Sequence, residues 1–362
     1  MKVAFRVDAS LQMGTGHVMR CLTLANALKL QGCECQFISR EHPGNLIAHI
    51  LHQGFKVHTL PLATTNVSSN SEPRLSHELW LGATQQQDAT ECSALLRDLQ
   101  LDWLIVDHYA LDARWEIALK EHYSRLMVID DLADRNHECD LLLDQTFGRD
   151  ISDYAPWTPS NCTLLCGSSY SLLRPEFSAL REFSLQRRKK AQLQHLLITM
   201  GGVDKDNATG QILLALQSSE LPADCRISVV MGATAPWLAE VCQLADQLRW
   251  PTEVKVGISD MAQLMADSDL AIGAAGATTW ERCCLGLPSI MLILADNQRG
   301  IAQALSNAGA ADLINMSTLD YNAIITNKHT SSSFLAEMSS SASAITDGLG
   351  TFRVISNLKI KG

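Results

Sequence analysis

The chain of 362 residues lacks any uninterrupted apolar run near the roughly 20 residues that a transmembrane helix requires. It also lacks a secretory signal pattern, because a strand-like run already begins at Lys2. Aromatic residues make up only 6% and charged residues 19%, whereas 46% of the residues are hydrophobic. These proportions are ordinary for a soluble globular protein. We therefore expect a cytoplasmic protein with no membrane partner.

Positive charge is in short supply. Lysine and arginine number 29 against 39 aspartates and glutamates, which gives a formal net charge of −10. Binding of nucleic acid depends on many lysine and arginine contacts to phosphate, so this balance argues against a nucleic-acid partner. A small phosphorylated ligand is still compatible with it, because helix N-termini bind phosphate without a basic surface.

The eleven cysteines lack the paired spacing of a structural zinc site. They are odd in number and scattered, and the nearest neighbours do not fit that spacing: Cys33 and Cys35, Cys162 and Cys166, and Cys283 and Cys284. We expect reduced thiols that fill small apolar sites, with no disulfide framework and no metal.

Short β-branched runs alternate with longer amphipathic segments, a rhythm that predicts βαβ units and parallel sheets. Helices are expected over 17–30, 46–53 and 80–99 and from about residue 208. The predicted strands of the first half are VAFRV, ECQFIS, KVHTL, WLIVDHY, RLMVIDD, DLLLD and TLLC, and those of the second half are HLLITM, RISVVMG, EVKVG, LAIGAAG and SIMLIL.

The composition changes at 173–190, a charged segment with Pro175 and a basic run from Arg187 to Lys190. A solvated linker explains this run better than a phosphate-binding patch does. We therefore predict a Rossmann-like domain over 1–172, a linker over 173–190 and a second Rossmann-like domain over 191–316. The Ser-rich remainder, 317–362, reads as a mobile helical region whose last segment, TFRVISNLKI, packs back on the body.

A glycine turn, Gly14-Thr15-Gly16, leads from the first strand into a helix that opens with His17. A dinucleotide-binding fingerprint requires a small residue where Met19 stands, so a nicotinamide cofactor is weakly supported. A histidine in the first helical turn is disfavoured as a cation by the helix dipole, which favours a neutral, basic imidazole. The spacing alone does not separate this role from that of a polar cap.

A second glycine turn, Gly201-Gly202, precedes the helix from about residue 208. Two glycines allow backbone amides to approach an anion, and the helix points its N-terminus at it. Asp204 and Asp206 also spell a D-x-D that could hold a divalent cation beside a diphosphate. An aspartate just before a helix is more often its N-cap, so the metal site is the less favoured interpretation.

Two later segments also follow predicted strands. The amides of Gly276, Ala277 and Thr278 suit a diphosphate, and Glu281 is spaced to reach ribose hydroxyls, although small residues there also permit close helix–sheet packing. Asn297 and Gln298 follow an apolar strand and suit sugar hydroxyls or acetamido groups, although loop solvation would explain them too.

The motifs together resemble one family. The segments are RVDAS with GTGHVMRCLTLA, VDHYALD, IDDLADRNHECDLLLDQT, GSSYSLLRPEF, TMGGVDKDNAT, DLAIGAAGATTWERCCLGLP and LADNQ, and they cover roughly residues 1 to 316. In content and order they are similar to the UDP-2,4-diacetamido-2,4,6-trideoxy-β-L-altropyranose hydrolases of pseudaminic acid biosynthesis, which resemble the MurG-like nucleotide-sugar glycosyltransferases.

The resemblance implies a GT-B fold, in which two Rossmann-like domains face each other across a cleft, the C-terminal one binding the nucleotide. It implies hydrolysis of a UDP-sugar by water attack at the anomeric carbon with inversion, without metal or cofactor, in a pathway that serves flagellin glycosylation.

The residue roles follow from the same resemblance. The catalytic base falls on His17, the active-site tyrosine on Tyr109, the uridine-side carboxylate on Glu281 and the sugar-binding asparagine on Asn297. The glycine segments at 201–202 and 275–278 match the nucleotide-side loops.

The residues leave three points open. Tyr109 at a strand end could be an aromatic of the core rim, whereas the neighbouring His108 is expected on the opposite face because strand residues alternate. A GT-B glycosyltransferase shares every nucleotide-side feature, because fold does not fix function. A non-catalytic UDP-sugar-binding protein of a surface-polysaccharide pathway would keep Glu281 but has no need of His17.

Overall fold

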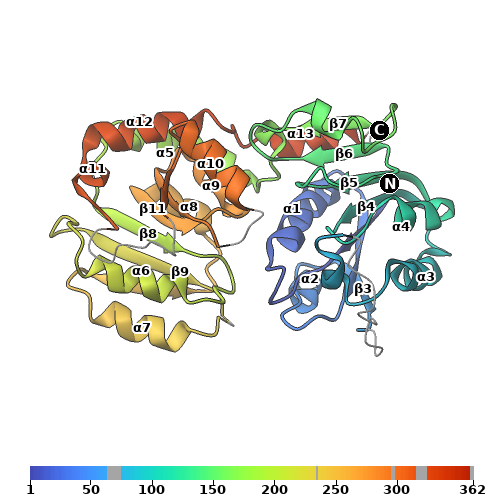
Figure 1. Ribbon diagram of the computed structural model, residues 1–362, viewed down its shortest axis with the longest axis horizontal. Coiled ribbons are helices and arrows are strands. Elements are labelled where there is room, and N and C mark those ends of the chain that lie inside the picture. Colours follow the sequence, from blue (N-terminus) through green and yellow to red (C-terminus); the bar gives the residue numbers. More distant parts are fainter. Residues whose placement is uncertain (63–74, 234, 295–297, 315–323, 359–362) are drawn as a thin grey trace. The chain divides into compact units, whose positions relative to one another are not determined.

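The computed structural model describes residues 1–62, 75–233, 235–294, 298–314 and 324–358. The chain divides into two compact units, Met1–Leu172 with Gly350–Gly362, and Leu173–Leu349. Each unit is a parallel β-sheet with helices on its faces (Figure 1). No helix of the described ranges is long and apolar enough to cross a bilayer.

The first unit contains a seven-stranded parallel sheet in the order β3-β2-β1-β4-β5-β6-β7. Every strand coincides with a predicted strand. The strands are β1 (Lys2–Val7), β2 (Glu34–Arg40), β3 (Lys56–Leu60), β4 (Leu101–Asp107), β5 (Tyr123–Ile129), β6 (Leu141–Asp144) and β7 (Thr163–Cys166). The helices between them are α1 (Gly16–Leu30), α2 (Ile47–His52), α3 (Gln85–Leu96) and α4 (Ala113–Ala118).

Alternation along β1 distributes its side chains between two apolar cores. Val3 and Phe5 join the core that contains α1, whereas Ala4 joins the core that contains α3. The helix predicted over 80–99 is shorter in the structure. A 3-10 helix, η1 (Glu78–Leu81), ends at Gly82, which has a left-handed φ of 66°. The α-helix starts only after Thr84, whose hydroxyl accepts a hydrogen bond from the amide of Gln87.

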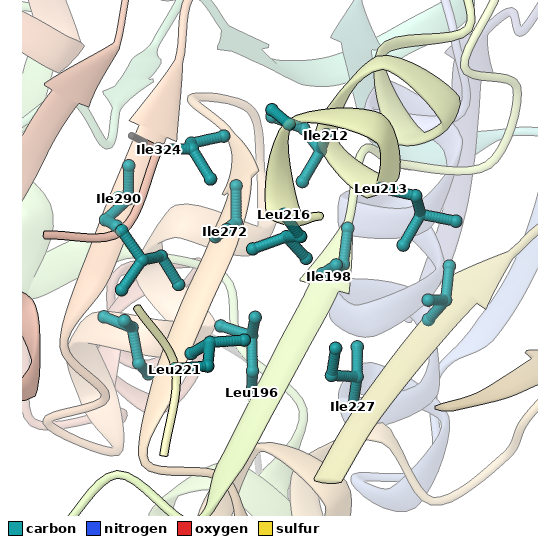
Figure 2. Close-up of a cluster of buried hydrophobic side chains, with 14 of the residues drawn as sticks. Leu196, Ile198, Ile212, Leu213, Leu216, Leu221, Ile227, Ile272, Ile290 and Ile324 are labelled. Atoms are coloured by element: carbon teal, nitrogen blue, oxygen red, sulfur yellow. The ribbon is translucent and has the colours of Figure 1, made fainter. Parts of the chain in front are cut away.

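The second unit contains a six-stranded parallel sheet in the order β10-β9-β8-β11-β12-β13. Its strands are β8 (His195–Thr199), β9 (Arg226–Met231), β10 (Thr252–Val256), β11 (Leu270–Ala274), β12 (Ser289–Leu292) and β13 (Asp312–Ile314), of which only the last was not predicted. The helices are α5 (Pro175–Arg188), α6 (Ala208–Leu216), α7 (Leu238–Asp246), α8 (Met261–Asp267), α9 (Thr278–Cys284), α10 (Arg299–Asn307), α11 (Asn327–Thr330) and α12 (Ser332–Ser343). Figure 2 shows part of the core, in which Ile198 and Ile272 of the sheet lie near Leu216 of α6.

The structure differs from the expected linker at 173–190. Most of this segment is α5, which is part of the second unit. The basic run does not simply face water: Arg188 is buried and donates to the carbonyls of Ser268 and Met265 at the end of α8. Arg187 forms an ion pair of 2.6 Å with Asp269. These cations satisfy carbonyls and a carboxylate at the end of α8 and so fasten α5 to it.

The C-terminal segment is divided between the units. Helices α11 and α12 lie in the second unit, whereas α13 (Gly350–Asn357) belongs to the first, beside α1 (Figure 1). Val354 and Leu358 are fully buried there, and the indole of Trp103 donates to the carbonyl of Leu358 at 3.1 Å. The last helix therefore packs back on the body, as the sequence predicted.

A buried ion network lies inside the first unit. Asp88 of α3 accepts hydrogen bonds from Arg6 of β1 at 2.6 Å and from Arg40 of β2 at 2.8 Å. Arg6 also pairs with Asp8 at 2.6 Å, and all four side chains are fully buried. Burial alone would raise the pKa of Asp88, but Arg6 and Arg40 hold that pKa below its usual value. The network thus fastens α3 to two strands with ionised groups.

We predict that Asp88→Asn lowers the free energy of unfolding by about 3–5 kcal/mol, because it leaves two buried guanidinium groups short of one negative charge. Urea denaturation followed by circular dichroism measures the change. Asp98→Asn, at an exposed position just beyond the same helix, is the control and should change stability little. Equal stability of the two variants would contradict this role for the network.

Candidate functional site

His17 stands in the first turn of α1, directly after the glycine turn that follows β1. The turn is closed by a hydrogen bond of 2.8 Å from the amide of Gly14 to the carbonyl of Ser10. Gly14 has a φ of 75°, a left-handed conformation that favours glycine, and Gly16 begins the helix. The turn therefore fixes the position at which the imidazole leaves the backbone.

The imidazole is held by a buried carboxylate at the end of β4. Nδ1 of His17 lies 2.6 Å from Oδ1 of Asp107, whose side chain is fully buried. Burial alone would raise the pKa of Asp107, but Arg20 and His17 outweigh it and hold that pKa well below its usual range. An ionised Asp107 can only accept, so it places the proton of a neutral His17 on Nδ1. Nε2 then carries the lone pair and can take a proton.

Arg20 and Asp131 extend this pair to Tyr109. Arg20 donates to both carboxylate oxygens of Asp107, at 2.6 and 2.7 Å, and to Asp131 at 2.6 Å. Asp131 in turn accepts the phenol proton of Tyr109 at 2.7 Å. Burial raises the pKa of Tyr109 well above its usual value, and the charge of Asp131 raises it further, so the phenol keeps its proton.

The structure brings the two predicted catalytic side chains together. The rings of His17 and Tyr109 meet edge to face with centroids 4.6 Å apart. His108 turns to the opposite side, as expected, where its Nε2 lies 3.3 Å from Asp8. Reasoning from the sequence missed Asp107, Arg20 and Asp131. A signal was present, because Asp107 is the last residue of one buried strand, Asp131 lies two residues after the end of the next, and Arg20 lies one helical turn after His17.

Asp204 has a structural role in the second unit. Its carboxylate accepts the amides of Ala208 and Thr209 at 2.8 and 2.9 Å, which caps the start of α6. The capping role that the sequence favoured for this aspartate is therefore confirmed, and a substrate contact of Asp204 stays a prediction. Within the described residues there is also no group of three or more His, Cys, Asp or Glu side chains that could hold a metal ion.

The paired glycines before that cap follow β8 directly. Gly201 has a φ of 91°, in the left-handed region. Gly232 packs against the backbone of Gly202, and a Cβ on Gly232 would lie 2.0 Å from the carbonyl oxygen of Gly202. Two strand ends therefore converge at this point, and a Cβ on Gly201 would meet open space, whereas Gly202 packs against Gly232.

The small residues before α9 surround a buried arginine. Arg282 is fully buried and donates to the carbonyl of Ala274 at 2.8 Å and to the hydroxyl of Thr278 at 3.2 Å. A Cβ on Gly273 would lie 2.5 Å from its guanidinium, so the glycine is needed for packing. Burial lowers the pKa of Arg282 to about 10. The amide of Thr279 donates to the carbonyl of Gly276 at 3.0 Å, whereas the amides of Gly276, Ala277 and Thr278 precede the first hydrogen bond of this helix.

Glu281 is mostly buried on the same helix. Its side chain is 17% exposed, and its nearest cation is Arg174, 3.7 Å away. Burial raises the pKa of Glu281 to about 7, against the opposing influence of Arg174 and Arg282. Its carboxylate therefore gains or loses a proton near neutral pH. Gln298 accepts the amide of Leu294 at 3.0 Å, and Asn297 lies outside the described residues.

The chain is similar to proteins that act on or are related to nucleotide sugars. Residues 176–348 match the model of the glycosyltransferase family 28 C-terminal domain. The chain is 29% identical over 310 residues to the UDP-2,4-diacetamido-2,4,6-trideoxy-beta-L-altropyranose hydrolase of Campylobacter jejuni, an alignment that covers 85% of this chain and 97% of that protein. The resemblance found in the motifs is therefore confirmed.

Two further matches concern extent and fold. The chain is 27% identical over 304 residues to the uncharacterized protein MJ1062 of Methanocaldococcus jannaschii, which covers 83% of this chain but 57% of that protein. The crystal structure of Acinetobacter baumannii MurG superposes with a TM-score of 0.72 at 16% identity, covering 99% of each chain. This likeness confirms the predicted fold class, a GT-B fold of two parallel-sheet α/β domains.

We predict that Arg174→Met raises the pKa of Glu281 further above 7, because it removes the cation that favours the ionised form. A titration of the glutamate carboxyl carbons by NMR measures this. Glu176→Gln is the matched control of opposite sign, since the charge of Glu176 raises the Glu281 pKa. An unchanged titration in Arg174→Met would show that this pair does not set the charge of Glu281.

Proposed function

We propose that this protein hydrolyses a UDP-sugar, UDP-2,4-diacetamido-2,4,6-trideoxy-β-L-altropyranose, to UDP and the free sugar. The observation that carries the proposal is the His17–Asp107 pair at the glycine turn, in which an ionised carboxylate orients the imidazole. The similarity to the Campylobacter hydrolase supports the choice of substrate. The step belongs to pseudaminic acid biosynthesis in this proposal.

In the proposed reaction, Nε2 of His17 removes a proton from a water molecule as that water attacks the anomeric carbon. The bond between this carbon and the oxygen of the β-phosphate breaks, UDP leaves with the electron pair, and the configuration inverts. The negative charge of Asp107 stabilises the imidazolium that forms. Gly14 and Gly16 allow the sugar to approach the turn, and Tyr109 orients the water or a sugar hydroxyl.

The second unit supplies the nucleotide contacts in this proposal. Backbone amides at 201–202 and 276–278 receive the diphosphate, so that UDP leaves without a strong general acid and without a metal. Glu281 accepts hydrogen bonds from the ribose hydroxyls. Gln298, whose Oε1 is occupied by the amide of Leu294, contacts the sugar through its NH₂ group, beside Asn297.

A glycosyltransferase is the second candidate, and the match of 176–348 to a glycosyltransferase domain favours it. In both reactions a base removes a proton from the nucleophile that attacks the anomeric carbon, and the nucleophile is water in one and an acceptor hydroxyl in the other. Incubation of the protein with the UDP-sugar in water alone separates them. A hydrolase releases free 2,4-diacetamido-2,4,6-trideoxyaltrose, visible by NMR, whereas a transferase without its acceptor is nearly silent.

We predict that His17→Asn lowers kcat by about 10²-fold or more and leaves the affinity for UDP nearly unchanged, because only the base is lost. Asp107→Asn should share much of this loss, since the imidazole loses the partner that fixes its tautomer. Release of UDP in a coupled assay measures kcat, and isothermal calorimetry measures UDP binding. His52→Asn, an exposed histidine on α2, is the control. Full activity of His17→Asn would remove the base assignment.

We also predict that Glu281→Ala weakens UDP binding by about 1–3 kcal/mol, because it removes a charge-assisted hydrogen bond to the ribose. In the wild-type protein this contribution should decline as the pH falls through about 7, where the carboxylate is protonated. Calorimetric titrations with UDP at pH 6 and pH 8 test both statements. Glu220→Ala, an exposed glutamate of the same unit, is the control, and equal affinities for UDP would overturn the contact.

A further inference from the structure

Three aromatic rings form a cluster beside His17. His77 and Trp80 are 4.3 Å apart between ring centroids, and Tyr109 lies 5.4 Å from His77 and 6.0 Å from Trp80. Tyr109 also meets His17 edge to face. We call His77, Trp80 and Tyr109 the aromatic wall.

Contacts with neighbouring side chains hold the Tyr109 ring of the aromatic wall in place. Its hydroxyl is bound by Asp131, and the guanidinium of Arg135 lies 5.9 Å from its ring centroid. The ring of Trp80 is inclined to that of Tyr109 by only 29°, a stacked arrangement. Because Asp131 also binds Arg20, which binds Asp107, hydrogen bonds connect the Tyr109 ring to the partner of His17. This connection fixes the position of the aromatic wall relative to the imidazole.

The residues of η1 and the preceding His77 differ in burial. Leu81 is fully buried and fastens the turn to the body of the unit, and the amide of Trp80 donates to the carbonyl of His77 at 2.9 Å. His77 and Trp80 are only half-buried, whereas Tyr109 beneath them is 6% exposed. Burial lowers the pKa of His77, and the nearby Arg135 also lowers it against the opposing charge of Asp134, so the neutral form of this ring is favoured.

A neutral aromatic surface next to a base that acts on a sugar is suited to the C–H face of a pyranose ring. Such a surface gains contact with a methyl group at C6. A hydroxyl group at C6 would instead lose hydrogen bonds to water without finding a partner among the rings.

We propose that His77 and Trp80 are specificity-determining residues, which pack against the apolar side of the hexose and select a sugar that is deoxygenated at C6. This inference rests on the proposed function, because it places the hexose next to His17. Hydrolysis itself requires neither His77 and Trp80 nor a preference at C6.

The test uses two nucleotide sugars that differ only at C6, UDP-2-acetamido-2-deoxyglucose and its 6-deoxy counterpart. Binding is measured by calorimetry in a His17→Asn background, so that no turnover disturbs the titration. We expect the background protein to prefer the 6-deoxy sugar by about tenfold. Adding Trp80→Ala should abolish most of that preference and leave the affinity for UDP alone unchanged, and Trp80→Phe should restore part of it.

Leu79→Ala is the matched control, since Leu79 lies on the same turn and is 70% exposed. It should keep the preference for the 6-deoxy sugar. For the full substrate in the wild-type background, Trp80→Ala should raise KM by about tenfold with a smaller change in kcat. His77→Ala should act in the same direction.

The outcomes distinguish the two proposals. If the wild-type protein releases no free sugar from any UDP-sugar but the Trp80 variant still loses the 6-deoxy preference, the hydrolase proposal fails and the aromatic wall stands. If hydrolysis occurs but the background protein shows no preference at C6, or Trp80→Ala keeps it, the wall is overturned. Failure of both sugars to bind would also overturn it. Loss of UDP binding together with the preference would mark Trp80 as merely structural, because the nucleotide contacts are proposed on other residues.

Discussion

The buried carboxylate of Asp107 is the interaction on which the candidate site depends. It ends β4 in the centre of the first sheet, where it is fully buried and accepts hydrogen bonds from His17 and Arg20 of α1. A charge in such a place is tolerable only when it is paired and fully hydrogen-bonded. The same bonds that satisfy the carboxylate therefore also fix the helix start, the imidazole and its tautomer. Structure and chemistry share one set of contacts.

Buried arginines join the functional elements throughout the chain. In the first unit, Arg20 links Asp107 to Asp131 and so to Tyr109, and Arg6 links Asp88 to Asp8. In the second unit, Arg282 ties Thr278 of α9 to the end of β11. A guanidinium presents several donors in a fixed plane, so each of these residues can bind two or more elements at once. Loops at strand ends are thereby held by hydrogen bonds and ion pairs.

The sequence anticipated the local features of the fold. Twelve of the strands in the described ranges coincide with predicted strands, and the interior ones were clearest because a parallel strand buried on both faces leaves an apolar run of consecutive residues. The glycine turns were visible too, since Gly14 and Gly201 occupy left-handed conformations that glycine favours. One error came from a distant partner. The sequence predicts a solvated linker over 173–190, because the carbonyl that accepts from Arg188 belongs to Ser268, 80 residues further along the chain. Asp204, in contrast, stabilises the start of its own helix, the role that the sequence favoured over a cation site.

By itself, the sequence determined that the chain forms two α/β domains and that His17 stands at a helix start behind two glycines. Periodicity and turn chemistry are written in neighbouring residues, so no fold is needed to find them. Only the tertiary structure decided that Asp107, 90 residues from His17, orients its imidazole, and that His77 and Trp80 stack beside Tyr109. Such partners meet because strand order and loop paths bring them together, and a linear chain carries no local mark of which distant side chain will lie within hydrogen-bonding reach.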